Sequence, residues 1–170
     1  LFSALLYSCS KDEPYVDIEL ISPVNYELTA MPYATLSDYN FFEGDLKNLN
    51  PVYGVVPYEL INPLFSDFST KKRFVWIPNN QSAVYIDDSS IFDFPIGSIL
   101  IKNFFYENVL PEMQNKIIET RLMIKKEEGW IFAGYTWNNS QLEAFFDLDG
   151  SNVSLQWSEN GVVSDVNYRI

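Results

Sequence analysis

From residue 72 to the end of the chain, short apolar segments alternate with turn sequences. The segments lie at residues 73–77, 83–86, 97–106, 117–125, 130–137, 142–148, 153–157 and 162–170. Several short strands separated by turns are typical of an antiparallel sandwich or barrel. The 13 Phe, 11 Tyr and 4 Trp favour the same class, because aromatic rings pack well on a pleated surface. We therefore predict a mainly β domain, an antiparallel sandwich or barrel-like fold with few short helices.

The clearest hairpin is predicted from residues 117–125 and 130–137. Side chains alternate between the two faces of a strand. In the first arm, one face is expected to carry Ile118, Thr120, Leu122 and Ile124, and the other Glu119, Arg121, Met123 and Lys125. Gly129 stands where the turn needs a positive φ. Asn160-Gly161 predicts a second hairpin between the last two segments.

The chain before residue 72 carries fewer strand signals. We assign residues 1–8 to the remainder of a signal peptide, 9–32 to a tether and 33–170 to the β-rich domain. The tether contains three prolines and has no clear periodicity. Residues 36–42 are predicted to form one short helix with Ser37 as its N-cap.

The first residues are typical of an exported protein. Residues 1–7 (LFSALLY) are too few to span a bilayer, which takes roughly 20 residues, but they match the end of a secretory signal. Residues 6–9 (LYSC) resemble the lipobox of bacterial lipoproteins, and residues 10–14 (SKDEP) resemble the surface-export signal of Bacteroidetes lipoproteins. We expect lipid attachment at Cys9, a membrane contact through the lipid and a location in the bacterial cell envelope, at the outer membrane or cell surface. The alternative is a free cysteine near a frayed terminus.

Composition excludes several functions for this chain. Lys and Arg total 11 against 23 Asp and Glu, a net charge of −12. Because a duplex-binding surface needs clustered positive charge, we expect no nucleic-acid partner. The absence of histidine excludes a Ser-His-Asp or Cys-His triad, and a single cysteine excludes an internal disulfide and a cysteine-based zinc cluster. We expect no cofactor in this chain and favour a non-catalytic role.

A ligand-binding cluster is predicted at the end of one strand. Trp137, Asn138 and Gln141 place two amides beside a large aromatic ring. Such a group suits a sugar, and Trp76 and Trp130 are further candidates for a stacking platform. The alternative is a core tryptophan followed by a turn, since asparagine favours local backbone hydrogen bonds.

Two acidic segments are weak candidates for a metal site. Asp147 and Asp149 alternate as in a calcium loop, but the bidentate glutamate and helical flanks of such a loop are missing. A hairpin turn built on Asp149-Gly150 is the favoured interpretation. Asp87, Asp88 and Asp93 also cluster, and a solvated loop explains them equally well.

Several unusual motifs resemble a poorly characterised family of secreted bacterial proteins related to dihaem c-type cytochromes. The motifs lie at residues 54–68 (GVVPYELINPLFSDF), 72–78 (KRFVWIP), 92–98 (FDFPIGS), 118–122 (IETRL), 129–130 (GW) and 135–138 (YTWN) with Gln141. The resemblance covers residues 36–170. It implies that a domain of this kind precedes a segment that holds haem. This chain has neither the C-x-x-C-H element nor a histidine ligand, so any haem is expected in a segment after residue 170.

Three functions follow as hypotheses. The first is a surface-anchored, non-catalytic accessory or docking domain of an envelope lipoprotein, attached to a c-type cytochrome module and meeting a redox partner. The second is a surface lipoprotein that binds or processes glycans. The third is a purely structural envelope protein.

Overall fold

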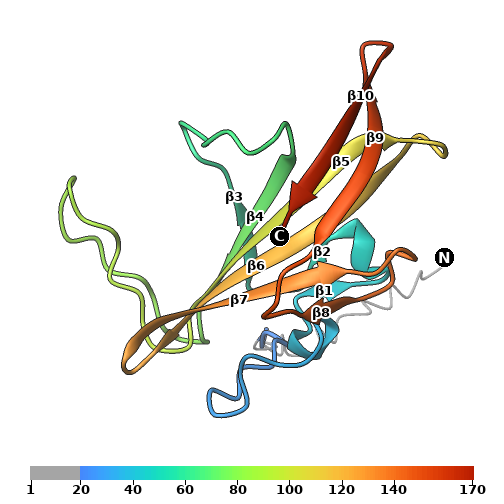
Figure 1. Ribbon diagram of the computed structural model, residues 1–170. Helices are drawn as coiled ribbons and strands as arrows, with labels where there is room; N and C mark the ends of the chain where they lie inside the picture. Colours follow the sequence, from blue (N-terminus) through green and yellow to red (C-terminus); the bar gives the residue numbers. More distant parts are fainter. Residues whose placement is uncertain (1–19) are drawn as a thin grey trace, which may run out of the picture.

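The computed structural model describes residues 20–170 (Figure 1). The proposed lipid-attachment residue Cys9 and the predicted signal remainder lie outside the described residues. The described chain is 46% strand and 4% helical, which confirms the prediction of a mainly β antiparallel fold with few short helices. No helix in residues 20–170 is long and apolar enough to cross a membrane.

Ten strands and two single-turn 3₁₀ helices follow one another in the described chain. The bounds are η1 Ser37–Tyr39, β1 Phe42–Glu43, η2 Leu46–Asn48, β2 Asn50–Pro51, β3 Val55–Tyr58, β4 Thr70–Trp76, β5 Ile99–Val109, β6 Gln114–Lys126, β7 Gly129–Trp137, β8 Ala144–Phe146, β9 Asn152–Glu159 and β10 Val162–Arg169.

One antiparallel sheet of eight strands dominates the fold. Strands β3 to β8 pair in sequence order, so each neighbour along the chain is also a neighbour in the sheet. The β9–β10 hairpin joins this sheet only at the end of β5, where Val109 faces Trp157. Strands β1 and β2 form a separate two-stranded sheet that packs against the large one.

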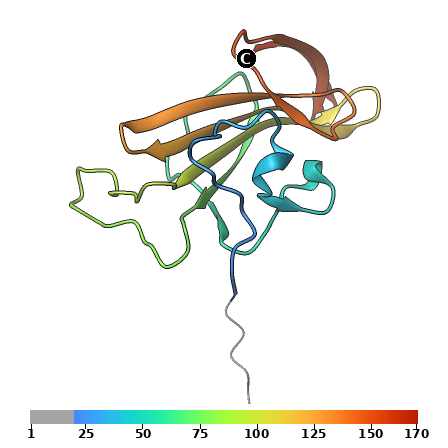
Figure 2. The ribbon, with the colours of Figure 1, turned by 90° about the horizontal axis from the view of Figure 1, so that it is seen from below.

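The first face of the large sheet is closed by the N-terminal part of the chain. Ile99 and Ile101 of β5 and Leu122 and Ile124 of β6 are fully buried on this face. Residues 20–52 lie over them and belong to the same hydrophobic cluster. Figure 2 shows this blue and cyan segment on one side of the sheet, whereas the red β9–β10 hairpin rises on the other.

A closed set of hydrogen bonds fastens the N-terminal segment to β7. The backbone N–H of Tyr33 donates to the Tyr39 hydroxyl at 3.1 Å, and the hydroxyls of Tyr39 and Tyr135 lie 2.8 Å apart. The Tyr135 hydroxyl donates back to the Tyr33 carbonyl at 2.8 Å. Every polar group of this set therefore has a partner inside the core, as buried polar groups require.

The packed part of the chain begins before residue 33, the predicted start of the β-rich domain. Ser22, Val24 and Met31, which the sequence analysis assigns to the tether, are buried. Ser22 accepts a hydrogen bond of 2.9 Å from the indole N–H of Trp76. The absence of periodicity in this segment is explained by its irregular path, which packs single side chains rather than one face of an element.

Two local predictions differ from the structure. The expected helix at 36–42 is one 3₁₀ turn, in which Ser37 lies inside the turn and Leu36 is the N-cap. The expected strand at 83–86 is a single bridge between Val84 and Asp93, within a long excursion between β4 and β5. In both places the residues bond to distant partners or to each other, which a local pattern does not reveal.

The two predicted hairpins are present, with one correction in the first. Asn160 and Gly161 both have positive φ, 51° and 81°, as a tight two-residue turn requires. In β6, however, the register shifts between Phe104 and Phe105 of the neighbouring strand, which leaves Ile118 opposite no residue. Ile118 therefore packs in the cluster of the second face rather than beside Leu122.

Candidate functional site

The second face of the sheet is covered only in part. The β9–β10 hairpin closes one end of it, where Leu155 and Tyr168 pack with Phe104, Tyr106 and Ile118. Over the middle of β4 to β7 the face is partly open: Arg73 and Glu119 are buried, whereas Arg121 is half exposed. The residues that lie there carry the chemistry of the site.

Three basic residues stand in a row across adjacent strands of this open face. Arg73 of β4 pairs with Lys102 of β5, and Lys102 pairs with Arg121 of β6. Tyr58 and Gly134 continue the row at its two ends. Like charges directly opposite each other on neighbouring strands destabilise a sheet, so this cationic row needs an explanation in a chain with a net charge of −12.

Carboxylates pair with two of the three cations. The buried Arg73 guanidinium lies 3.3 Å from Glu59, whose side chain is 77% exposed. Arg121, half exposed, lies 2.6 Å from the buried carboxylate of Glu119. Lys102 forms no ion pair within residues 20–170.

Lys102 and Arg121 converge on one aromatic ring. The Lys102 ammonium lies 4.5 Å, and the Arg121 guanidinium carbon 4.7 Å, from the centre of the Phe104 ring. Cations are attracted to the face of such a ring, so Phe104 holds both groups near each other despite their repulsion.

The surroundings of Lys102 disfavour its charge. Burial lowers the pKa of Lys102 below the ordinary lysine value, and the positive charges of Arg73, Arg121 and Lys71 lower it further. Glu119 acts in the opposite direction. A negative group placed at Lys102 would relieve this excess of positive charge.

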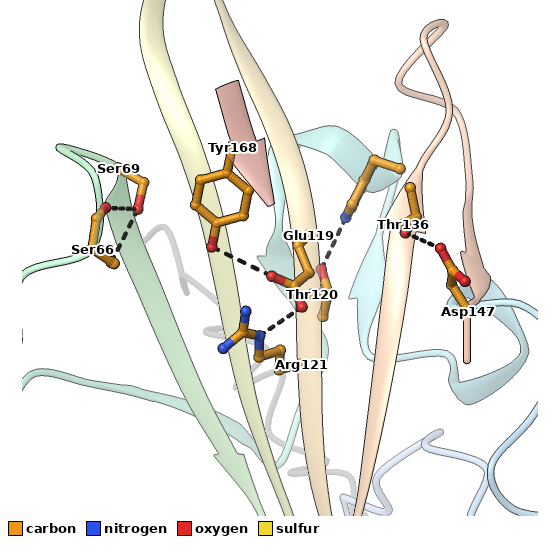
Figure 3. A network of polar contacts seen from close by, with 9 residues as sticks. Ser66, Ser69, Glu119, Thr120, Arg121, Thr136, Asp147 and Tyr168 are labelled. Atoms are coloured by element: carbon orange, nitrogen blue, oxygen red, sulfur yellow. Dashed lines mark hydrogen bonds and ion pairs between the residues drawn. The ribbon is translucent and has the colours of Figure 1, made fainter. Parts of the chain in front are cut away.

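Glu119 fixes the position of Arg121. Figure 3 shows its carboxylate between the Tyr168 hydroxyl, which donates over 3.4 Å, and the Arg121 Nε–H, which donates over 2.6 Å. The bond to Glu119 raises the pKa of Arg121, and burial followed by the charge of Glu119 raises the pKa of the Tyr168 hydroxyl. Glu119 is therefore held in a charged hydrogen bond that orients the guanidinium.

A cavity of about 590 Å³ lies over β5, β6 and β7. The charged residues that line it are Lys102, Glu119, Arg121 and Asp147. Leu100, Met123, Phe132, Leu148 and Ile170 contribute to its apolar walls. Volumes of this size are usual for small-molecule sites, which combine mostly apolar walls with a few polar groups. The arrangement can hold an anion at its cationic end.

The structure places the predicted ligand-binding cluster in and beside the core. The Trp137 side chain is buried, and its indole N–H donates to the Thr120 hydroxyl at 2.9 Å. The Gln141 amide bonds to both backbone groups of Ile117, at 2.7 and 3.0 Å. The side-chain oxygen Oδ1 of Asn138 accepts from the backbone N–H groups of Leu142 and Glu143 in the turn that follows. These groups serve the fold here, and the hypothesis of an exposed sugar platform gains no support from Trp137.

The weak metal candidates also serve a turn. One Asp147 oxygen accepts the backbone N–H groups of Asp149 and Gly150 at 3.0 and 3.1 Å, and the other accepts the Thr136 hydroxyl at 2.9 Å. These bonds lower the pKa of Asp147. Within residues 20–170, no three or more His, Cys, Asp or Glu side chains gather as a metal site would require.

Sequence reasoning missed the cationic row altogether. Its three members are separated by 29 and 19 positions, and only the register of β4, β5 and β6 brings them side by side. A partial signal exists at Lys102, which stands alone in the apolar run ILIKNFF, but Arg73 ends the basic run Lys71-Lys72-Arg73. A lone cation in a central strand is unusual and indicates a paired or functional group.

Comparisons of the chain with protein-family models, with curated proteins and with solved structures find no match. The resemblance to proteins related to dihaem c-type cytochromes therefore stays a prediction. The interpretation of the site depends on the residues of this chain.

Proposed function

We propose that this chain is a non-catalytic accessory domain of an envelope lipoprotein that binds an anionic ligand on the open face of its large sheet. The row of Arg73, Lys102 and Arg121 is the observation that carries the proposal. The anchor at Cys9 and a neighbouring c-type cytochrome module are parts of the same proposal that depend on the sequence motifs alone.

The geometry supports binding over catalysis. Glu119, the one buried carboxylate in the cavity, accepts hydrogen bonds from Arg121 and Tyr168, so it orients the guanidinium. Of the three cations in the row, Lys102 is the one without an ion pair in the described chain. An anion that accepts hydrogen bonds from Lys102 and Arg121 would balance the site, and charge-assisted bonds of this kind are among the stronger polar contacts.

The direct test is a titration with the aromatic anion 1-anilinonaphthalene-8-sulfonate, followed by fluorescence. We expect saturable binding to the wild-type chain and a loss of about tenfold in affinity for Lys102→Gln, because one charge-assisted contact is worth about 1.5 kcal/mol or more. The affinity of the wild-type chain should also fall as salt is raised.

The matched control is Lys47→Gln, which removes an exposed lysine from η2 in the segment that covers the first face. This variant should bind the probe as the wild-type chain does. Equal binding by the wild-type chain and Lys102→Gln would contradict the proposal, as would an equal loss in the Lys47 variant.

A further inference from the structure

An apolar row runs beside the cationic row on the same open face. Strand register places Val56 opposite Val75, Val75 opposite Leu100, Leu100 opposite Met123, and Met123 opposite Phe132. Val75, Leu100 and Met123 each stand two positions along their strand from a member of the cationic row. The two rows are therefore about 7 Å apart. The cationic row crosses three strands over about 10 Å, and the apolar row crosses five strands over about 19 Å.

The apolar row is open to solvent in the described chain. Val56 is 54% and Phe132 71% exposed, and the three residues between them are only partly buried. Leu100, Met123 and Phe132 line the same cavity as Lys102 and Arg121. One cavity therefore joins a cationic end to an apolar strip, which suits a ligand with one anionic and one apolar part.

The balance of charge indicates a single negative group. Within the cationic row, Glu59 pairs with Arg73 and Glu119 pairs with Arg121, which leaves Lys102 without an ion pair. Asp147 also lines the cavity, and its oxygens accept hydrogen bonds from Thr136, Asp149 and Gly150. A ligand with one carboxylate would neutralise the row. A polyanion such as a nucleic acid or an acidic protein would instead be repelled by the net charge of −12.

We propose that the open face binds a long-chain fatty acid, with its carboxylate at Lys102 and Arg121 and its hydrocarbon chain along Leu100, Met123 and Phe132. This inference depends on the proposed anion-binding function and names the class of its ligand. The apolar row supplies the surface that a hydrocarbon chain needs, and the ligand in turn covers apolar side chains that are otherwise in water.

The test is calorimetric titration of the 170-residue chain with acetate, octanoate, decanoate and dodecanoate below their micelle concentrations. We expect the affinity to rise about twofold to fourfold with each added methylene, since a buried methylene contributes up to about 0.8 kcal/mol. Lys102→Gln should weaken the binding of dodecanoate about tenfold.

Two variants locate the hydrocarbon chain. Phe132→Ser should weaken dodecanoate at least threefold and leave acetate unchanged. The control Phe65→Ser changes a phenylalanine of the β3–β4 loop that is 72% exposed, against 71% for Phe132, and should leave both ligands unchanged. Both side chains are mostly in solvent, so neither substitution is expected to unfold the domain.

The results separate this inference from the proposed function. If dodecanoate binds no more tightly than acetate while 1-anilinonaphthalene-8-sulfonate still depends on Lys102, the fatty-acid inference is wrong and anion binding stands. If dodecyltrimethylammonium binds as tightly as dodecanoate, the cationic row does not distinguish an anionic from a cationic head group. Both proposals are then wrong. An equal loss in the Phe65 and Phe132 variants would contradict the placement of the hydrocarbon chain.

Discussion

The two faces of the large sheet are built from the same strands but differ in what covers them. On the first face, residues 20–52 bury a mostly apolar layer that includes Ile101 and Leu122. On the second face, a hairpin covers one end, and a row of cations beside exposed apolar side chains occupies the middle. Alternate residues of one strand point to opposite faces of the sheet. One set of side chains can therefore stabilise the core while the other set is free to form a binding surface.

Neighbouring residues on opposite faces of β6 should give the largest contrast. Leu122→Ala is expected to lower the free energy of unfolding by about 2–5 kcal/mol, because it opens a cavity in a closed core. Met123→Ala, at the next position on the open face, should cost less than about 1.5 kcal/mol, since its side chain is partly in solvent already. Urea denaturation measures both, and equal losses would contradict the distinction between the faces.

The hydroxyl groups of two tyrosines should give a smaller contrast. Tyr135→Phe removes the hydroxyl between Tyr39 and the Tyr33 carbonyl, and it should cost about 1–2 kcal/mol because buried partners lose their hydrogen bonds. The Tyr58 hydroxyl, on the second face, makes no hydrogen bond within residues 20–170. Tyr58→Phe should therefore leave the melting temperature within error, and a drop equal to that of Tyr135→Phe would show that the second face is as tightly bonded as the first.

The smallest effect is expected at Lys102. Lys102→Gln should raise the free energy of unfolding at pH 7 by a few tenths of a kcal/mol, because relief of like charges exceeds the lost contact with Phe104. The pKa of Lys102 is lower in the folded than in the unfolded chain, so the folded state releases this proton first as pH rises. The charge of Lys102 therefore lowers the free energy of unfolding fully at neutral pH, and this effect disappears toward pH 10.5. At that pH the wild-type chain and the variant should have the same free energy of unfolding.

Thermal unfolding of wild type, Lys102→Gln and Lys47→Gln at pH 7 and pH 9.5 measures this effect. The Lys47 variant should match wild type at both values, since Lys47 lies in the segment that covers the other face. A loss above about 1 kcal/mol in Lys102→Gln would mean that Lys102 stabilises the sheet. The cationic row would then be part of the fold rather than a binding site.

Much of the fold could be predicted from local patterns. The strands at 97–106, 117–125 and 130–137 appear as β5, β6 and β7 because alternation and turn glycines act between neighbours in the chain. The segment at 83–86 has similar composition but no partner strand beside it, so it forms only one bridge. The packing of residues 22–31 also escaped prediction, since single buried side chains such as Val24 and Met31 leave no periodic signal.

The predicted ligand-binding residues and the proposed site lie in different places. Trp137, Asn138 and Gln141 are adjacent in the chain, which made them visible, but they bond to β6 and to their own turn. The cationic row combines residues from three strands. Lys102 is unusual as a single position, but its neighbours Arg73 and Arg121 are recognised as members of a row only when the register is known.

The sequence by itself determined the class of fold, the positions of the main strands and turns, and the exclusion of histidine chemistry, because these depend on residue types and on near neighbours. Only the tertiary structure decided which face of the sheet is closed, where the packed domain begins, and that Arg73, Lys102 and Arg121 meet. The reason is physical: register and covering segments are set by contacts between residues far apart in the chain, and a one-residue shift such as the one at Ile118 moves a side chain to the other face.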